Sequence, residues 1–202
     1  MELIIPTDMR NLQFPSPEET TYWECRKNRT FFIDYEFGDD YMLMELGKTI
    51  VSMNISEKDI PKEDLKPIQL WIHSFGGDAY QNRAFRSILT SSRIPIITVA
   101  MGTCMSSGFD IFLGGTRRYV FNDSCLMCHA GYLTLSGSQS EVEDAQKNNK
   151  VINEKDKKYI LSRTSIPEAI YKKKLKNDWY FTNEEIENYG IAKIITSFEE
   201  IV

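Results

Sequence analysis

Two serines and a histidine in the middle of the chain are of the types that catalyse hydrolysis. Ser106 and Ser107 follow a continuous apolar run, and His129 ends the short segment CLMCH. A serine hydroxyl is a weak nucleophile at neutral pH and needs a neighbouring base, which an imidazole can provide. Serine also caps helix starts, and a lone histidine is more often structural than catalytic. At this point both interpretations stand.

The segment SFGGD, residues 74–78, could supply hydrogen-bond donors to the same chemistry. A strand that ends at Gly76 and Gly77 leaves backbone N–H groups unpaired and lets another chain approach closely. Such N–H groups can stabilise a developing oxyanion. A tight turn that merely requires glycine explains the pair as well. The second histidine, His73, lies on the strand that leads into this segment, with no nucleophile beside it.

The CLMCH segment also contains Cys125-x-x-Cys128-His129, the pattern that attaches c-type haem. Haem attachment normally follows export, and the first residues lack the basic and long apolar regions of a secretory signal. A zinc site would need a second pair of ligands, and the sequence has no other pair at suitable spacing. We therefore expect no metal and no cofactor, with Cys125 and Cys128 acting as packing residues.

Composition narrows the classes of partner. The chain has 202 residues, of which 42% are hydrophobic and 26% charged, as is ordinary for one soluble domain. Its net charge of −5 predicts no basic face, so nucleic acid is not an expected partner. No run of 18 apolar residues is present, so no membrane segment is expected. We expect a cytoplasmic protein.

Strands that alternate with helices must position these residues. This alternation predicts an α/β domain with a largely parallel sheet. Residues 1–29 contain Pro6, Pro15 and Pro17 and are expected to be loosely ordered, without a regular element. Residues 131–139 are expected to form a loop or small hairpin. The expected strands are 30–37, 68–73, 95–102, 117–121, 125–129 and 191–197, and the expected helices are 41–55, 78–92, 106–115, 140–164, 166–175 and 182–190.

Four of these segments, in order, resemble the ClpP family, the proteolytic subunits of the Clp protease. The resemblance runs from about Thr30 to Ile195, and its intervals fit the family apart from a loop about two residues shorter between Ser106 and His129. The family's S-P-G-G, A-A-S-M-G and M-I-H correspond here to Ser74-Phe75-Gly76-Gly77, Cys104-Met105-Ser106-Ser107-Gly108 and Met127-Cys128-His129. The family's acid precedes a segment that here runs from Tyr180 to Gly190.

The resemblance implies a ClpP/crotonase-like fold of repeated β-β-α units over residues 30–202, with a protruding long-helix handle at about 136–163. It also implies a serine peptidase with a catalytic triad. Nucleophile, base and acid would be Ser106, His129 and Asp178. The oxyanion hole would use the N–H groups of Gly76 and Ser107. Substrate would lie as an added strand beside two segments, Gly77, Asp78 and Ala79, and Gly131, Tyr132 and Leu133.

The same resemblance implies a seven-membered ring, possibly stacked as a tetradecamer through the long helix. An AAA+ unfoldase would deliver unfolded polypeptides, and ATP would enter only through that partner. Four of the residues that depart from the family lie at motif positions: Phe75 replaces a proline, Ala130-Gly131 replaces Gln-Pro, and Asn177 replaces the arginine that pairs across stacked rings. One alternative is a catalytically silent ring subunit that pairs with an active paralogue. A crotonase-type acyl-CoA enzyme and a c-type haem protein are further alternatives.

Overall fold

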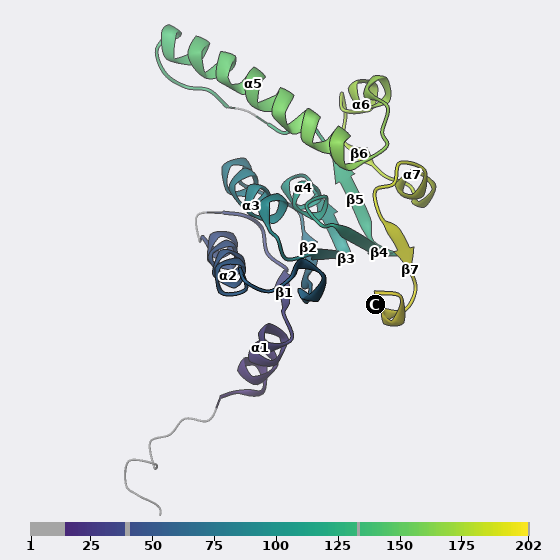
Figure 1. Ribbon diagram of the computed structural model, residues 1–202. Helices are drawn as coiled ribbons and strands as arrows, with labels where there is room; N and C mark the ends of the chain where they lie inside the picture. Colours follow the sequence, from purple (N-terminus) through teal and green to yellow (C-terminus); the bar gives the residue numbers. More distant parts are fainter. Residues whose placement is uncertain (1–14, 39–40, 133, 202) are drawn as a thin grey trace, which may run out of the picture.

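The computed structural model describes residues 15–38, 41–132 and 134–201 (Figure 1). Its strands are β1 (Thr30–Ile33), β2 (Ile68–Ser74), β3 (Ile96–Met105), β4 (Arg117–Phe121), β5 (Cys125–Cys128), β6 (Trp179–Tyr180) and β7 (Lys193–Ile195). Its helices are α1 (Pro17–Lys27), α2 (Met42–Ser56), α3 (Ala79–Ser91), α4 (Ser107–Phe112), α5 (Gln139–Arg163), α6 (Glu168–Lys174) and α7 (Asn183–Asn188), with 3-10 turns η2 (Lys62–Asp64) and η3 (Phe198–Ile201).

The sheet has the parallel order β1-β2-β3-β4-β7. Strand β3 is long enough to pair with two successive partners along one side. Its residues 97–100 pair with β4, and its residues 103–105 pair with β5. Strand β6 extends the sheet as an antiparallel partner of β5. These pairings confirm the expected α/β domain with a largely parallel sheet.

The core lies between the sheet and helices α2, α3 and α4, which gather on one side of it (Figure 1). Strand β2 alternates buried and less buried residues, with Ile68, Leu70 and Ile72 fully buried. Phe85 from α3 and Phe109 from α4 are also fully buried. This packing fixes α4 against β3, so the turn between them has a defined position.

Helix α5 is the expected long helix, and its N-terminal half projects away from the rest of the subunit (Figure 1). It begins with a capping box, in which Ser138 and Glu141 satisfy each other's backbone N–H groups. Ile160 is the buried residue of this helix. Within the described part of the chain, no helix is long and apolar enough to cross a bilayer.

Several elements differ in length from the sequence expectations, and one helix and one strand lie where neither was expected. Residues 17–27, expected to lack a regular element, form α1, because Pro17 occupies the first helical turn and Ser16 and Glu19 form a capping box. None of the α1 residues is buried. Strand β6 was not expected, since two residues carry no periodicity to recognise. Around the gap at residue 133, the described residues of 131–138 contain no strand.

Candidate active site

Ser106 sits at the turn where β3 ends and α4 begins. Its backbone has φ 53° and ψ −126°, a conformation that is costly for a residue with a side chain. The N–H of Ser106 donates to the Met127 carbonyl at 2.9 Å, and the Ser106 carbonyl accepts from Asp110 N–H at 3.2 Å. Although Ser106 holds the N-cap position of α4, its side chain makes no capping bond. The hydroxyl is therefore left for another partner.

That partner is His129, which follows the last residue of β5. The Nε2 atom of His129 lies 2.7 Å from Ser106 Oγ, at hydrogen-bond distance. The other ring nitrogen, Nδ1, lies 3.4 Å from Asp178 Oδ1. Asp178 directly precedes β6, and the pairing of β6 with β5 brings it beside the histidine. The Asp178 side chain is 44% exposed, whereas that of His129 is 14% exposed. The turns after β3 and β5 and the start of β6 thus bring the three predicted residues together.

The glycine segment lies against this turn. A Cβ added to Gly76 would lie 2.8 Å from the Met105 carbonyl oxygen and 2.9 Å from Ser107 N, so Gly76 is in close contact with the start of α4. Its φ of 104° also favours glycine. The N–H of Gly76 donates to Ser74 Oγ at 3.1 Å. To donate to an oxyanion, the Gly76 N–H would have to break its hydrogen bond to Ser74 Oγ.

Gly77 contacts a different segment. Phe37 forms a parallel bridge with Gly77, in which Phe37 N–H donates to the Gly76 carbonyl at 2.7 Å and Asp78 N–H donates to the Phe37 carbonyl at 2.8 Å. The two hydrogen bonds of this bridge therefore use the Gly76 carbonyl and the Asp78 N–H. The N–H and carbonyl of Gly77 itself lie on the opposite side of the chain. There, Ser107 Oγ donates to the Gly77 carbonyl at 3.0 Å.

Ser107 is the first residue of α4, and its side chain is buried. Backbone N–H groups in the first turn of a helix have no acceptor within the helix. Its N–H is therefore suited to receive a ligand oxygen beside Ser106. The hydroxyl of Ser107 is already engaged by Gly77, which argues against Ser107 as the nucleophile.

The residues predicted to contact substrate lie at the edges of this site. Asp78 caps α3, with its Oδ1 accepting from Gln81 N–H at 2.7 Å, and Ala79 begins that helix. Tyr132 is 92% exposed and packs edge-on against His129, with ring centroids 5.5 Å apart. Gly131 has a φ of 74° and open space around it. Leu133 lies outside the described residues.

Cys104 and Cys128 have the environment of packing residues, whereas Cys25 and Cys125 are only partly buried. Cys104 and Cys128 are buried in the core, and burial raises the pKa of both thiols. A protonated buried thiol is a poor nucleophile and a poor metal ligand. No group of three or more His, Cys, Asp or Glu residues among the described ones is arranged to hold a metal ion. His73 accepts a hydrogen bond from Thr103 N–H through Nδ1 at 3.0 Å, which ties β2 to β3.

The sequence model of the Clp protease family matches residues 24–198, nearly the whole described fold. The chain belongs to the Clp protease family. The ClpP/crotonase-like fold expected from the four segments is therefore confirmed, with its parallel sheet and its long helix α5.

Curated relatives from three bacteria share this family. The chain is 28% identical over 139 residues to ATP-dependent Clp protease proteolytic subunit 2 of Treponema denticola, covering 67% of this chain and 70% of that one. It is 25% identical to subunit 3 of Rhodococcus jostii over 178 residues, 87% of this chain and 85% of the relative. It is 23% identical to the proteolytic subunit of Deinococcus radiodurans over 172 residues, 84% of this chain and 81% of the relative.

One group of polar residues in this Clp family chain was missed by sequence reasoning. Arg83, Arg86, Asp110 and Asp156 form a cluster of opposite charges between α3, α4 and α5. The four positions span 73 residues of sequence and show no common spacing, so only the packing of the three helices brings them together. No signal in the sequence marks them as a group.

Proposed function

We propose that this Clp family subunit is a serine endopeptidase that cleaves unfolded polypeptides with a triad of Ser106, His129 and Asp178. The observation that supports it most directly is the 2.7 Å contact between Ser106 Oγ and His129 Nε2 at a strained turn. A strained serine between a strand and a helix is the geometry that exposes a nucleophile in other hydrolases. Family membership raises the expectation of peptide hydrolysis further.

The chemistry follows from the roles of the three side chains. Ser106 Oγ attacks the scissile carbonyl carbon while His129 Nε2 takes its proton. The resulting imidazolium returns that proton to the leaving amine, and water then hydrolyses the acyl-enzyme by the reverse transfer. Asp178 accepts from Nδ1–H, which fixes the tautomer and stabilises the imidazolium. The 3.4 Å separation of Nδ1 and Asp178 is long for a hydrogen bond, as is common before substrate binds.

Two backbone donors would stabilise the oxyanion. Ser107 N–H is one of them, as expected from the sequence. For the second donor, the contacts favour Gly77 over the expected Gly76. The Gly76 N–H is bonded to Ser74 Oγ, whereas the Gly77 N–H faces the side of Ser107. Each such donor typically contributes about 3 kcal/mol to the stabilisation of the transition state.

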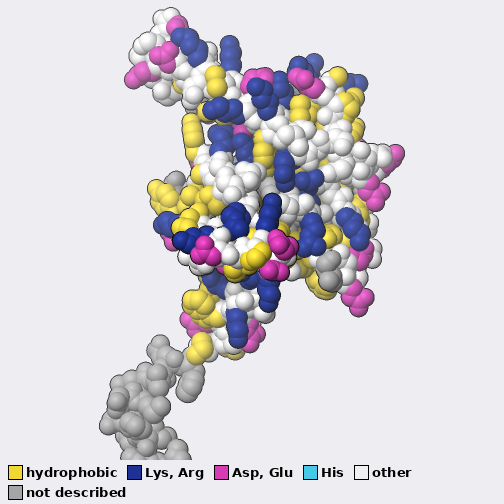
Figure 2. All heavy atoms as spheres, viewed as in Figure 1, with side chains coloured by type: hydrophobic (Ala, Val, Ile, Leu, Met, Phe, Trp, Pro, Cys, Tyr) yellow, Lys and Arg dark blue, Asp and Glu magenta, His cyan; other side chains and the backbone are white. Residues whose placement is uncertain are grey.

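We propose a homo-oligomeric ring of seven subunits, single or stacked in pairs, that works in the cytoplasm with an AAA+ unfoldase. Side chains exposed on α2, such as Val51 and Ile55, support burial of this helix in an assembly, since large apolar groups in water are unfavourable. Figure 2 shows hydrophobic side chains gathered at the left edge of the molecule, where α2 lies. The projecting α5 supports contact with a second ring.

The second candidate is a catalytically silent ring subunit that assembles with an active paralogue. Two observations favour it: Asp178 is half-exposed at 3.4 Å from His129, and the Gly76 N–H is held by Ser74. The departures Phe75 and Ala130-Gly131 are next to Gly76 and His129 in the chain, and Phe75 is 58% exposed.

Labelling with a fluorophosphonate, which reacts with activated serines, separates the two candidates. We expect the full-length protein to be labelled at Ser106, as mapped by peptide mass spectrometry, and Ser106→Ala to lose the label. Ser140→Ala, which removes an exposed hydroxyl far from the site, serves as the matched control. Mass spectrometry of the intact assembly reports the number of subunits in the same sample. An assembled ring without label at Ser106 would favour the silent subunit, and a monomer would contradict the ring.

A further inference from the structure

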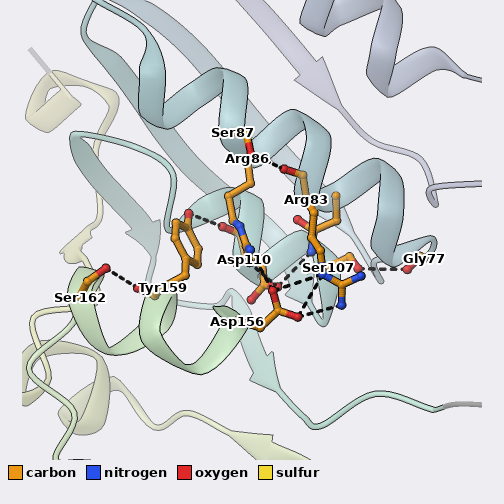
Figure 3. A network of polar contacts seen from close by, with 10 residues as sticks. Gly77, Arg83, Arg86, Ser87, Ser107, Asp110, Asp156, Tyr159 and Ser162 are labelled. Atoms are coloured by element: carbon orange, nitrogen blue, oxygen red, sulfur yellow. Dashed lines mark hydrogen bonds and ion pairs between the residues drawn. The ribbon is translucent and has the colours of Figure 1, made fainter. Parts of the chain in front are cut away.

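A compact cluster of charges joins three helices beside the candidate nucleophile (Figure 3). Asp156 of α5 accepts hydrogen bonds from Arg83 Nη2 and Arg86 Nη2 of α3, each at 2.8 Å. Arg86 also lies over the ring of Tyr159, 4.1 Å from its centroid. One carboxylate on α5 thus holds two guanidinium groups of α3 in place.

The cluster continues to α4 through Asp110. Its Oδ2 accepts from Asn82 Nδ2 at 2.9 Å and lies 3.6 Å from Arg86 Nη1. The Arg86 Nη1 atom is buried and has no hydrogen-bond partner in the described structure, so its attraction to Asp110 is electrostatic at this distance. The Tyr159 hydroxyl donates to the backbone carbonyl of Asp110 at 2.9 Å. Both the side chain and the backbone of Asp110 are therefore held by neighbouring helices.

Asp110 is connected directly to the strained turn. Its N–H donates to the Ser106 carbonyl at 3.2 Å, the first hydrogen bond of α4. Ser106 holds a positive φ, which persists only where the surroundings determine it. Because α4 has only six residues, we infer that a shift of Asp110 would move the helix as a unit, and the Ser106 turn with it.

We propose that Asp110 is a positioning residue for Ser106, and that its ionised carboxylate, held by Arg86 and the α5 residue Asp156, keeps the nucleophile turn aligned. This inference rests on the proposed function, because it concerns the reactivity of the same serine. With both carboxylates ionised, the two arginines are matched by two negative charges. When Asp110 takes up a proton, the folded protein no longer bears the cost of burying that carboxylate, but the attraction of α4 to Arg86 is lost.

The surroundings of Asp110 make that proton uptake accessible near neutral pH. Burial raises the pKa of Asp110 to about 6, and the nearby carboxylate of Asp156 raises it as well, against the opposing effects of Asn82, Arg86 and Arg83. Groups on four other elements also face Asp110: Tyr159 on α5, Tyr171 on α6, Cys104 on β3 and Cys128 on β5. Burial and the Asp110 charge raise the pKa of all four, so they stay neutral over the same range. Asp110 is the group of this cluster that changes charge near pH 6.

The variant Asp110→Asn tests this role, because the amide keeps the shape of the protonated carboxyl. We expect the fluorophosphonate to label the wild type about tenfold faster than the variant near pH 8, a loss within the range that a misplaced catalytic group causes. Near pH 5 the two rates should converge, because Asp110 of the wild type is then protonated. The ratio of the two rates at each pH is compared, so that effects common to both proteins cancel. A rate ratio that is independent of pH would mean that Asp110 is only a packing residue and would overturn the proposal.

A second measurement needs no activity and uses Asp156→Asn. We expect faster amide hydrogen exchange in residues 107–112, because α4 loses part of its anchor. Asp144→Asn, the same substitution on the exposed part of α5, should leave that exchange unchanged. Unaltered exchange of α4 in Asp156→Asn would overturn the link between α5 and the turn. If the wild type is not labelled at all, the proposed function fails, and hydrogen exchange still decides whether the cluster positions α4.

Discussion

His129 Nε2 lies 2.7 Å from Ser106 Oγ, although the two residues follow different strands. The contact exists because β5 pairs with the last residues of β3, which places Met105 opposite Met127. Ser106 N–H extends that ladder by donating to the Met127 carbonyl. The sheet itself therefore sets the distance between the candidate nucleophile and its base.

The first prediction concerns the base. His129→Ala should reduce the rate of fluorophosphonate labelling at Ser106 by about 10⁴-fold or more, because the hydroxyl then has no proton acceptor. Rates are measured from the time course of label incorporation at constant pH. His73→Ala is the comparison variant, since His73 bonds a backbone N–H between β2 and β3 and should not alter the rate in a correctly assembled protein. Equal losses in the two variants would argue against a specific role of His129.

The second prediction concerns the acid. Asp178→Asn should reduce the labelling rate about 10- to 100-fold. This loss is smaller than the roughly 10⁴-fold loss seen for a buried triad aspartate. The reason is that Asp178 is 44% exposed and 3.4 Å from the imidazole, so water already weakens its interaction. The rate constants of this variant and of His129→Ala are compared in one experiment. A loss as large as that of His129→Ala would show that Asp178 closes onto the histidine in the working assembly.

The third prediction concerns the glycine segment. Gly76→Ala should abolish labelling and destabilise the fold, because its Cβ would meet the Met105 carbonyl oxygen and Ser107 N within 3 Å at a φ of 104°. Gly190→Ala is the matched control: its φ is also positive, but its nearest neighbour is Ser165 Oγ at 3.6 Å. We expect the control to lose about 1–2 kcal/mol from backbone strain and to retain labelling. Thermal unfolding and labelling of both variants check this, and normal labelling of Gly76→Ala would contradict the close packing at the turn.

The fourth prediction is a dependence of stability on pH. Because the folded-state pKa of Asp110 is raised to about 6, ionisation of this group opposes folding. As pH falls through about 6, the folded protein binds this proton before the unfolded chain does, near its pKa of about 3.9. The wild type should thus gain about 2 kcal/mol relative to Asp110→Asn between pH 8 and pH 4. Urea unfolding of both proteins at one subunit concentration measures the difference, and a constant difference would contradict a raised pKa.

Local patterns predicted the strands that lead to Ser106 and His129, because both are apolar runs. The expected end at residue 102 was too early: β3 continues to Met105, and its residues 103–105 pair with β5. Asp178 came only from the family resemblance, because β6 is two residues long and no pattern marks its start. The bond from Gly76 N–H to Ser74 Oγ could not be foreseen, since it depends on the conformation of one turn. The same holds for the cluster around Arg86, whose members meet only after three helices pack.

Helix α5 has 25 residues, and Ile160, near its C-terminal end, is the one that is buried. Most of this helix therefore gains little from the hydrophobic effect within its own subunit, and isolated helices of such composition are marginal in water. In the proposed ring a neighbouring subunit would supply the missing contacts to its N-terminal half. If so, a dilute subunit would show less helical circular dichroism than a concentrated assembly, and proteases would cut first between residues 139 and 150. The helix content of this protein would then rise with its concentration.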